Sequence, residues 1–246
     1  MNYYEHKVDW TDAKVDRFWN FKSNYKPLQE EWFTQQVGDS IISFAKKYFS
    51  SKDNLEVLDY GAGKGHLTSL LLLENISVSA CDFSNENIIN LNSKFSSYSN
   101  FNDGILIRKF PTLFESNLFD FVFLIEAIEH LTDDYLESTI KEIMRILKPN
   151  GKIMITTPNN ENLELGNVCC PDCGAIFHKM QHVQSFNKDV LIGLMQNIGF
   201  RTIFCKNINF ADYKQFSLKR ELGRLARFLK NSQKRKPHLV FVGEKK

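Results

Sequence analysis

No apolar run in this chain of 246 residues approaches the roughly 20 residues that a membrane-spanning helix needs. Residues 1–7 lack the charged-then-apolar layout of a secretory signal peptide. Only five residues are cysteine, and the chain has no internal repeat and no low-complexity linker. These absences argue against a transmembrane protein, a secreted disulfide scaffold and a repeat protein. We therefore expect a cytoplasmic protein whose cysteines need no disulfide partners.

The composition is that of an ordinary soluble globular protein, with 43% hydrophobic and 24% charged residues. The length fits one α/β domain with additions. The net charge of +2 is unevenly placed, because residues 206–246 carry +9 and residues 1–205 carry −7. Such a basic segment either favours an anionic partner, such as a phosphorylated substrate, nucleic acid or a membrane surface, or is a solvated helix.

A glycine-rich loop follows an apolar strand at residues 57–65, which read Val-Leu-Asp-Tyr-Gly-Ala-Gly-Lys-Gly. Between a strand and the helical pattern of residues 66–73, these glycines let the backbone turn tightly and approach a ligand. The dinucleotide-binding pattern G-x-G-x-x-G/A is not completed, because His66 stands at its last position. Asp59 would also repel a pyrophosphate. A carboxylate at this place suits a cationic ligand instead.

This loop resembles motif I of the class I S-adenosylmethionine-dependent methyltransferases. A second short strand, 77–82, ends in Asp82, 21 residues after the first glycine, where a carboxylate can accept hydrogen bonds from both ribose hydroxyls. Residues 118–131 resemble the family's fourth strand and the loop after it. Residues 142–159 resemble its helix, tight turn and fifth strand. Together these segments extend the resemblance over roughly residues 50–205.

The resemblance implies an enzyme with a doubly wound α/β fold, in which a mostly parallel, Rossmann-like sheet has seven strands. We expect the sixth strand at residues 199–205 and the seventh at 237–243, the latter antiparallel and at the edge side of the sheet. The cofactor implied by the family is S-adenosylmethionine. Its expected contacts are Asp59, Tyr60, Gly61, Gly63, Gly65, Asp82, Phe83, Phe110 and Glu126.

The adenine contact departs from the family pattern. We expect the third strand at residues 104–107, and family members often carry an acidic residue after it that meets the adenine amino group. This chain continues instead with Arg108, Lys109 and Phe110. We expect Phe110 to stack on the adenine, or a backbone group to replace the missing contact.

We divide the chain into an N-terminal helical cap, residues 1–50, and a methyltransferase domain, residues 51–246. The domain includes a Cys/His loop at 166–184 and an insertion at 206–236 that is predicted to form an amphipathic basic helix. Aromatic residues of the cap either wall a substrate pocket or belong to the core: Phe18, Trp19, Tyr25, Trp32 and Phe33. The candidate substrate contacts are Tyr25, Phe33, Asn159 and His182.

The Cys/His loop has the spacing C-x2-C-x4-H-x3-H, close to that of a small zinc knuckle. It predicts a structural zinc ion held by Cys170, Cys173, His178 and His182. Cys169 can replace Cys170 in this reading. Free inert thiols or redox chemistry are the alternatives, and His182 also resembles a histidine that faces the active site in many family members.

Methyl transfer from a sulfonium mainly requires alignment of the acceptor, the methyl group and the sulfur. A protonated acceptor also needs a general base, and Glu129 and His130 follow the fourth strand on the side where the methyl group should lie. His130 is the better candidate because an unperturbed imidazole titrates near about pH 6.5. Its alternative reading is a hydrogen-bonded residue at the start of a helix. We expect Glu126 to contact the methionine part of the cofactor.

The chain looks similar to methyltransferases of bacterial surface-glycan pathways, such as capsule and other carbohydrate biosynthesis. That implies a small acceptor, either sugar-linked or anionic and phosphate- or nucleotide-bearing, with O-methylation favoured. One alternative is an RNA or protein methyltransferase that docks through the basic segment, although nucleic acid is the less favoured partner. Another is a cofactor-binding module without activity. The adenine-N6 DNA methyltransferases are disfavoured because no N-P-P-Y-type motif follows the fourth strand.

Overall fold

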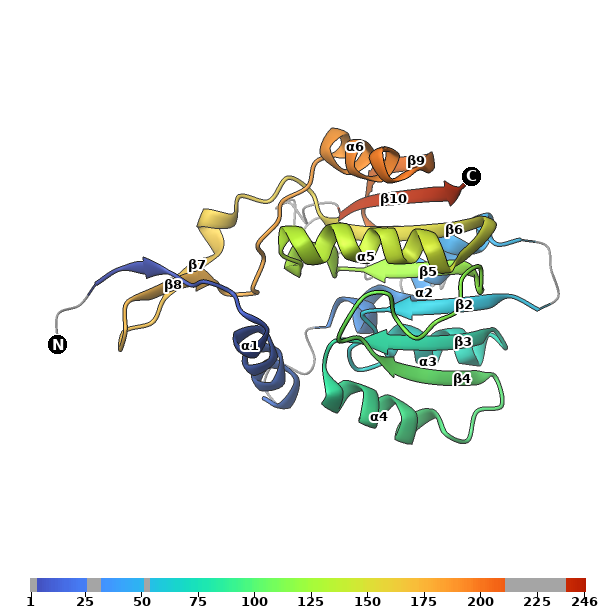
Figure 1. The fold of residues 1–246 in the computed structure, drawn as a ribbon, viewed down its shortest axis with the longest axis horizontal. Coiled ribbons are helices and arrows are strands. Elements are labelled where there is room, and N and C mark those ends of the chain that lie inside the picture. Colours follow the sequence, from blue (N-terminus) through green and yellow to red (C-terminus); the bar gives the residue numbers. More distant parts are fainter. Residues whose placement is uncertain (1–3, 26–31, 51–53, 211–237) are drawn as a thin grey trace, which may run out of the picture.

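The computed structural model describes residues 4–25, 32–50, 54–210 and 238–246. Within these residues seven strands form one sheet in the order β4-β3-β2-β5-β6-β10-β9 (Figure 1). Strands β4, β3, β2, β5 and β6 run parallel, and β10 is antiparallel to both of its neighbours. The strands are β2 (Glu56–Tyr60), β3 (Ser77–Asp82), β4 (Phe101–Leu106), β5 (Phe119–Ile125), β6 (Leu147–Pro158), β9 (Phe200–Ile208) and β10 (His238–Lys245).

The predicted fold class is therefore confirmed: a doubly wound, mostly parallel sheet with an antiparallel last strand. Strand β10 lies on the edge side of the sheet, between β6 and β9, and β9 forms the edge itself. Strand β9 is longer than expected, because its pairing with β10 continues to Ile208, opposite His238.

Helices cover both faces of the sheet, and strand β5 shows the effect on sequence. All seven of its residues are buried, as expected for a parallel strand packed on both faces. Phe121 and Phe123 share a core cluster with α2, α3 and α4, whereas Val122 and Leu124 share the other with α5 and α6. The helices are α2 (Phe33–Ala45), α3 (His66–Leu73), α4 (Asn85–Phe95), α5 (Asp133–Ile146) and α6 (Lys188–Ile198).

Residues 1–50 do not pack as one cap. Helix α2 contributes Ile41 and Phe44 to the core of the main domain. Helix α1 (Asp12–Asn24) lies instead beyond the carboxyl ends of the parallel strands, beside a small three-stranded sheet (Figure 1). In that sheet β8 (Ala175–His178) pairs antiparallel with β7 (Asn167–Cys169) and parallel with β1 (His6–Lys7).

Three short 3-10 helices complete the described elements: η2 (Lys46–Tyr48), η3 (Ile128–His130) and η4 (Leu163–Gly166). Residues 211–236 of the predicted basic helix lie outside the part of the chain that the structure describes. Residues 206–208, which begin the predicted insertion, form the end of β9. No helix in the described part of the chain has the length and apolar character that a bilayer span requires.

Candidate active site

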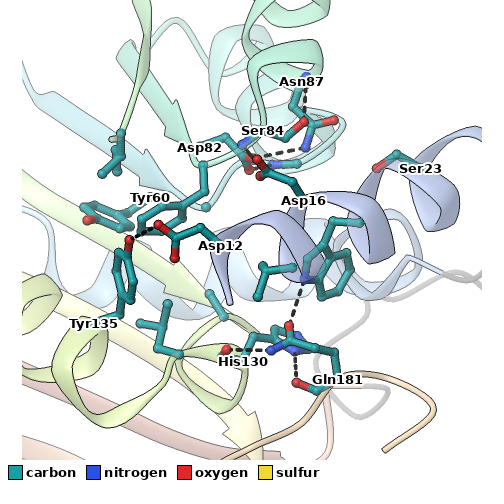
Figure 2. Close-up of a pocket in the computed structure, with 18 of the residues that line it drawn as sticks. Asp12, Asp16, Ser23, Tyr60, Asp82, Ser84, Asn87, His130, Tyr135 and Gln181 are labelled. Carbon is teal, nitrogen blue, oxygen red and sulfur yellow. Dashed lines mark hydrogen bonds between the residues drawn. The ribbon is translucent and has the colours of Figure 1, made fainter. Parts of the chain in front are cut away.

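A cavity opens at the carboxyl ends of β2, β3 and β5 and is closed on its far side by α1. Its volume is about 210 Å³. Figure 2 shows Asp82 on one side of the cavity, His130 with Gln181 on the other, and Asp12 and Asp16 of α1 between them. The cavity therefore has polar side chains on two opposite sides.

The glycine loop forms one wall of this cavity. Gly61 (φ 76°) and Gly63 (φ 52°) adopt left-handed conformations that favour glycine, and both line the cavity. A Cβ atom at Gly63 would meet no atom within 4 Å, so the backbone of the loop faces open space. Gly65 serves a different purpose. A side chain there would collide with Leu91 and Phe95, so Gly65 allows α3 and α4 to pack closely and does not line the cavity.

Asp82 ends β3 with its carboxylate in the cavity wall. One oxygen, Oδ2, accepts a hydrogen bond from the backbone N–H of Gly63 at 2.9 Å. The other, Oδ1, accepts from the N–H of Ser84 at 2.8 Å and from Asn87 Nδ2 at 3.1 Å. Burial raises the pKa of Asp82, and these hydrogen bonds oppose that shift. Asn87 also lines the cavity, and its buried Oδ1 has no hydrogen-bond partner among the described residues.

Asp59 does not lie where the sequence predicts. Its carboxylate is 3% exposed, and its Oδ2 accepts from the N–H and the hydroxyl of Thr68, at 3.1 and 2.6 Å. Burial raises the pKa of Asp59 to about 6, against the effect of these hydrogen bonds. Asp59 therefore ties the end of β2 to the first turn of α3 and does not line the cavity. Tyr60, the next residue, does line it.

Glu126 follows β5 with a left-handed backbone, at φ 48°, which non-glycine residues rarely adopt. Its backbone N–H donates to the carbonyl of Thr156 at 2.9 Å. Its Oε1 accepts from Thr156 Oγ1 at 2.7 Å and lies 3.1 Å from His238 Nδ1. These contacts hold the carboxylate in the cavity wall.

The predicted adenine contact of Phe110 is not found at the cavity. Phe110 packs against the core and against the ring of Tyr135, with a centroid distance of 6.3 Å. The wall beside Asp82 is instead made by Phe83, as expected, and by Ile107 and Arg108. Phe110 therefore lies behind Tyr135, which lines the cavity, and sequence spacing alone carries no information about this placement.

Three tryptophans, Trp10, Trp19 and Trp32, line the cavity, and Trp19 lies on the side of His130 and Gln181. Trp19 Nε1 donates to Gln181 Oε1 at 2.9 Å, and its ring meets that of His130 edge to face at 4.7 Å. The buried Nε1 of Trp32 has no hydrogen-bond partner among the described residues. Trp10 was missed by the sequence analysis because it precedes α1, outside any periodic pattern.

None of the four predicted substrate contacts lines the cavity, since His182 lies behind His130 and the other three lie elsewhere. Tyr25 is 47% exposed and stacks on Phe21, and Phe33 packs beside Phe210. Asn159 forms an isolated bridge with the chain at Phe186.

A histidine cluster lies under the tryptophans. His130, in η3, lines the cavity, and its Nδ1 is 3.4 Å from the carbonyl of Gln181. Burial, together with the charge of His182, lowers the pKa of His130 to about 3, so the ring is neutral at physiological pH. The ring of His182 lies 4.9 Å from that of His130, and its Nδ1 is 2.5 Å from Glu161 Oε2.

Glu129 is buried beside this cluster. It is 1% exposed, and its Oε2 accepts from the hydroxyl of Thr157 at 3.0 Å. Burial raises the pKa of Glu129 well above its usual range, with a further contribution from the charge of Glu126. Glu129 does not itself line the cavity, but its Oε1 lies 3.9 Å from His130 Nε2.

The sequence profile of a methyltransferase domain matches residues 29–203, which is more than half of the chain. The chain belongs to that family. It is a class I S-adenosylmethionine-dependent methyltransferase.

Relatives of this methyltransferase are distant. It is 27% identical to an uncharacterised protein of Methanocaldococcus jannaschii over 187 residues, which cover 76% of this chain and 72% of that protein. It is 26% identical to the mitochondrial ubiquinone biosynthesis O-methyltransferase of Bos taurus, over 92% of this chain but only 64% of that protein's length. Among solved structures, the fold is similar to the 1,6-didemethyltoxoflavin-N1-methyltransferase of Burkholderia thailandensis, with bound 1,6-didemethyltoxoflavin and S-adenosylhomocysteine. That comparison has a TM-score of 0.64 and 16% identity, and covers 97% of this chain and 93% of the other.

The four predicted zinc ligands of the methyltransferase are not brought together. In the described residues, His178 and His182 group with Glu161, and neither Cys170 nor Cys173 joins any such group. The reason is the hairpin that β7 and β8 form. Both cysteines lie in its turn, whereas His178 lies at its base, opposite Asn167, and the extended strand β8 separates the two ends. No disulfide forms among the five cysteines, all of which lie in the described residues.

The charge of the methyltransferase cavity is mainly negative. Asp12, Asp16, Asp82 and Glu126 line it, and among the described lining residues Arg108 alone carries a permanent positive charge. Arg108 Nη1 is 3.4 Å from Asp16 Oδ2, so part of that charge is already neutralised. A cationic cofactor suits this field, and a phosphate-bearing acceptor does not.

Proposed function

We propose that the enzyme transfers the methyl group of S-adenosylmethionine to a hydroxyl of a small, uncharged, sugar-like acceptor. The acceptor binds between the tryptophans beside α1 and the histidine cluster. The observation that carries this proposal is the division of one cavity into a cofactor wall at Asp82 and a tryptophan–histidine wall opposite it.

The cofactor wall fits S-adenosylmethionine. The open backbone at Gly63 admits a ligand, the carboxylate of Asp82 suits ribose hydroxyls, and Glu126 suits a cationic group. The unpartnered Oδ1 of Asn87 offers a further buried acceptor on the same wall. The bound cofactor supplies a methyl group on a sulfonium, and these residues hold it and exclude water from it.

The acceptor wall fits a ring that carries several hydroxyls. Indole faces pack against the apolar face of such a ring, and the carboxylates of Asp12 and Asp16 accept hydrogen bonds from its hydroxyls. The unpartnered Nε1 of Trp32 offers a donor to one of its oxygens. This support favours a neutral sugar over the phosphate- or nucleotide-bearing acceptor that the basic segment alone suggests.

His130 holds the reacting hydroxyl in this proposal. Its neutral ring accepts the hydroxyl proton in a hydrogen bond, which directs an oxygen lone pair toward the methyl carbon. As the oxygen–carbon bond forms, the carbon–sulfur bond breaks with its electron pair remaining on sulfur, and the hydroxyl proton passes to His130 and from there to water. His130 is a weak base because its pKa is low, so positioning is the larger part of its role.

A second acceptor class, a phenol, is favoured by one observation: the relative from Bos taurus is named an O-methyltransferase of ubiquinone biosynthesis. Three indole rings also suit a flat aromatic ring. The carboxylates of Asp12 and Asp16 favour the sugar, because a phenol offers fewer hydroxyl donors to satisfy them.

The test is an assay for S-adenosylhomocysteine formation with matched acceptors: neutral sugars, their phosphorylated forms, catechols and an RNA. We expect turnover with a neutral sugar and little with its phosphorylated form. Preferential turnover of the phosphorylated form or of RNA would reject the neutral acceptor. Cofactor binding without turnover of any acceptor would point to a binding module instead.

A further inference from the structure

The histidine cluster has a second property that methyl transfer to a sugar does not require. Glu129, His130 and His182 each offer one ligand atom, and the three atoms lie within 4.8 Å of one another. We propose that these three residues bind a divalent transition-metal ion, of the zinc type, in the wall of the cavity. The set contains no cysteine and differs from the predicted zinc knuckle in all but His182.

The hydrogen bonds of His130 and His182 leave one nitrogen with a lone pair in each ring. A carbonyl oxygen only accepts, so the Nδ1 of His130, 3.4 Å from the carbonyl of Gln181, carries its proton. The Nδ1 of His182 likewise donates to the carboxylate of Glu161. Both rings therefore keep a lone pair on Nε2. A ligating histidine typically donates its other N–H to a carbonyl or carboxylate in this way.

The neighbouring group of Glu161, His178 and His182 fails the same test. The Nδ1 of His178 accepts from the backbone N–H groups of Met180, at 3.3 Å, and His182, at 3.2 Å. Its proton is then on Nε2, which faces Glu161 Oε1 at 3.7 Å. A protonated nitrogen offers no lone pair to a metal. His178 and Glu161 therefore orient His182 and do not ligate.

The third ligand, Glu129, is held firmly in place. Its Oε2 is fixed by Thr157, which leaves Oε1 facing His130 Nε2 at 3.9 Å. Its backbone carbonyl accepts the N–H groups of Val183 and Gln184, so η3 is tied to the segment that carries His182. The side chain of Gln181 also donates to the carbonyl of His130 at 3.0 Å. The two halves of the site are thus joined before any ion binds.

Two histidines and one carboxylate leave coordination positions open on the ion. Because His130 lines the cavity, an acceptor hydroxyl can take such a position, a role that rests on the proposed function. When the ion is bound, Nε2 of His130 ligates it, and the ion rather than the ring then holds the hydroxyl. The ion lowers the pKa of the bound hydroxyl, which releases its proton to water. The resulting oxygen then attacks the methyl carbon, and the carbon–sulfur electron pair leaves with sulfur.

Metal binding can be measured without an acceptor. The full chain, purified without a polyhistidine tag and treated with chelator, is titrated with Zn²⁺ by calorimetry and with Co²⁺ by absorbance. We expect one ion per chain, and a Co²⁺ spectrum without the intense thiolate-to-cobalt band that a cysteine ligand gives. His182→Ala and Glu129→Gln should abolish tight binding, and Glu161→Gln should weaken it by about 10–100-fold.

The matched control is Cys170→Ser/Cys173→Ser, which should leave the affinity unchanged. S-adenosylmethionine binding by each variant shows that it is folded. Loss of the ion in the cysteine variant, or no ion binding by a wild-type chain that binds the cofactor, would overturn the site. Sugar methylation by a metal-free enzyme would leave the proposed function standing and remove only the role of the ion in it.

Discussion

The two walls of the cavity are built in different ways. The cofactor wall comes mainly from one stretch, residues 60–87, in which backbone groups of neighbouring strand ends and loops hold Asp82. The acceptor wall joins segments that are far apart in the chain. Trp19 meets Gln181, and the hydroxyl of Tyr135 donates to Asp12 at 3.0 Å. One wall follows from local sequence, and the other exists only after the chain has folded.

This difference has a consequence for variation. The cofactor wall depends on backbone geometry that few sequences satisfy, whereas the acceptor wall depends on side chains that can change one at a time. Substitutions should therefore separate into two groups: those that change affinity for S-adenosylmethionine and those that change turnover or the KM for the acceptor.

The largest expected effect lies on the acceptor wall, at His130. His130→Ala should lower kcat by roughly 10²–10⁴-fold, because it removes the group that holds the reacting hydroxyl. The dissociation constant of S-adenosylmethionine, measured by calorimetry, should barely change. His6→Ala, which removes an exposed histidine in β1, is the control. Near-normal kcat in His130→Ala would show that His130 does not hold the reacting hydroxyl.

A smaller effect, on stability, is expected behind the cofactor wall. Burial raises the pKa of Asp59 from 3.8 to about 6, so the folded chain holds this proton more tightly than the unfolded chain. The protonated carboxyl thus contributes stability that is complete below pH 3.8 and is lost as the pH rises through about 6.

Asp59→Asn cannot ionise and still offers Thr68 an oxygen. Its free energy of unfolding should therefore lack this loss, which is on the order of 3 kcal/mol. Urea unfolding of both proteins at about pH 4 and about pH 8 measures it. An equal loss of stability in both would mean that Asp59 is not the group that titrates.

On the cofactor wall itself, Asp82→Ala should weaken S-adenosylmethionine binding by about 1.5–3 kcal/mol, the range for hydrogen bonds to a charged group. Calorimetry gives the affinity directly. Phe110→Ala serves as the comparison, because Phe110 does not line the cavity and its loss should lower the affinity less than the loss of Asp82 does. Equally weak binding of S-adenosylmethionine by Phe110→Ala would support the predicted contact between Phe110 and the adenine.

The smallest effect is expected at Trp32. Trp32→Phe keeps an aromatic ring but removes the N–H that has no partner among the described residues. If that N–H binds the acceptor, KM should rise by the equivalent of about 0.5–1.5 kcal/mol, with cofactor affinity unchanged. Steady-state kinetics, with the acceptor that the enzyme turns over fastest, measures this KM. An unchanged KM would mean that the N–H of Trp32 does not bind the acceptor.

The sequence predicted the order of strands and helices, because a buried parallel strand and a glycine loop each leave a local pattern. Asp82, predicted from the end of a strand, lines the cavity, and its contact with the cofactor stays a prediction. Asp59 and Phe110 do not line the cavity, since a motif specifies which residue follows a strand and not the direction of its side chain. Asn87 and Gln181 left no signal, because their partners come from the folded arrangement.

The Cys/His spacing failed for a related reason. The pattern C-x2-C-x4-H-x3-H assumes that the chain turns back between Cys173 and His178, but residues 175–178 form an extended strand. Spacing counts residues, whereas ligation depends on distance in space. In the folded chain the histidines lie beside Glu129 and Glu161, although no spacing in the sequence connects these carboxylates to them.

The pairing of β1 with β8 determines how this enzyme can open. The N–H groups of His6 and Val8 donate to the carbonyls of Gly174 and Ile176, and Trp10 packs on Phe177. The chain before α1 is therefore fastened to the hairpin, and the segment after the hairpin leads directly to His182. Displacing α1 to release a product pulls on the hairpin and on His182 as well. We therefore expect any movement of α1 to be coupled to movement of the hairpin and of His182.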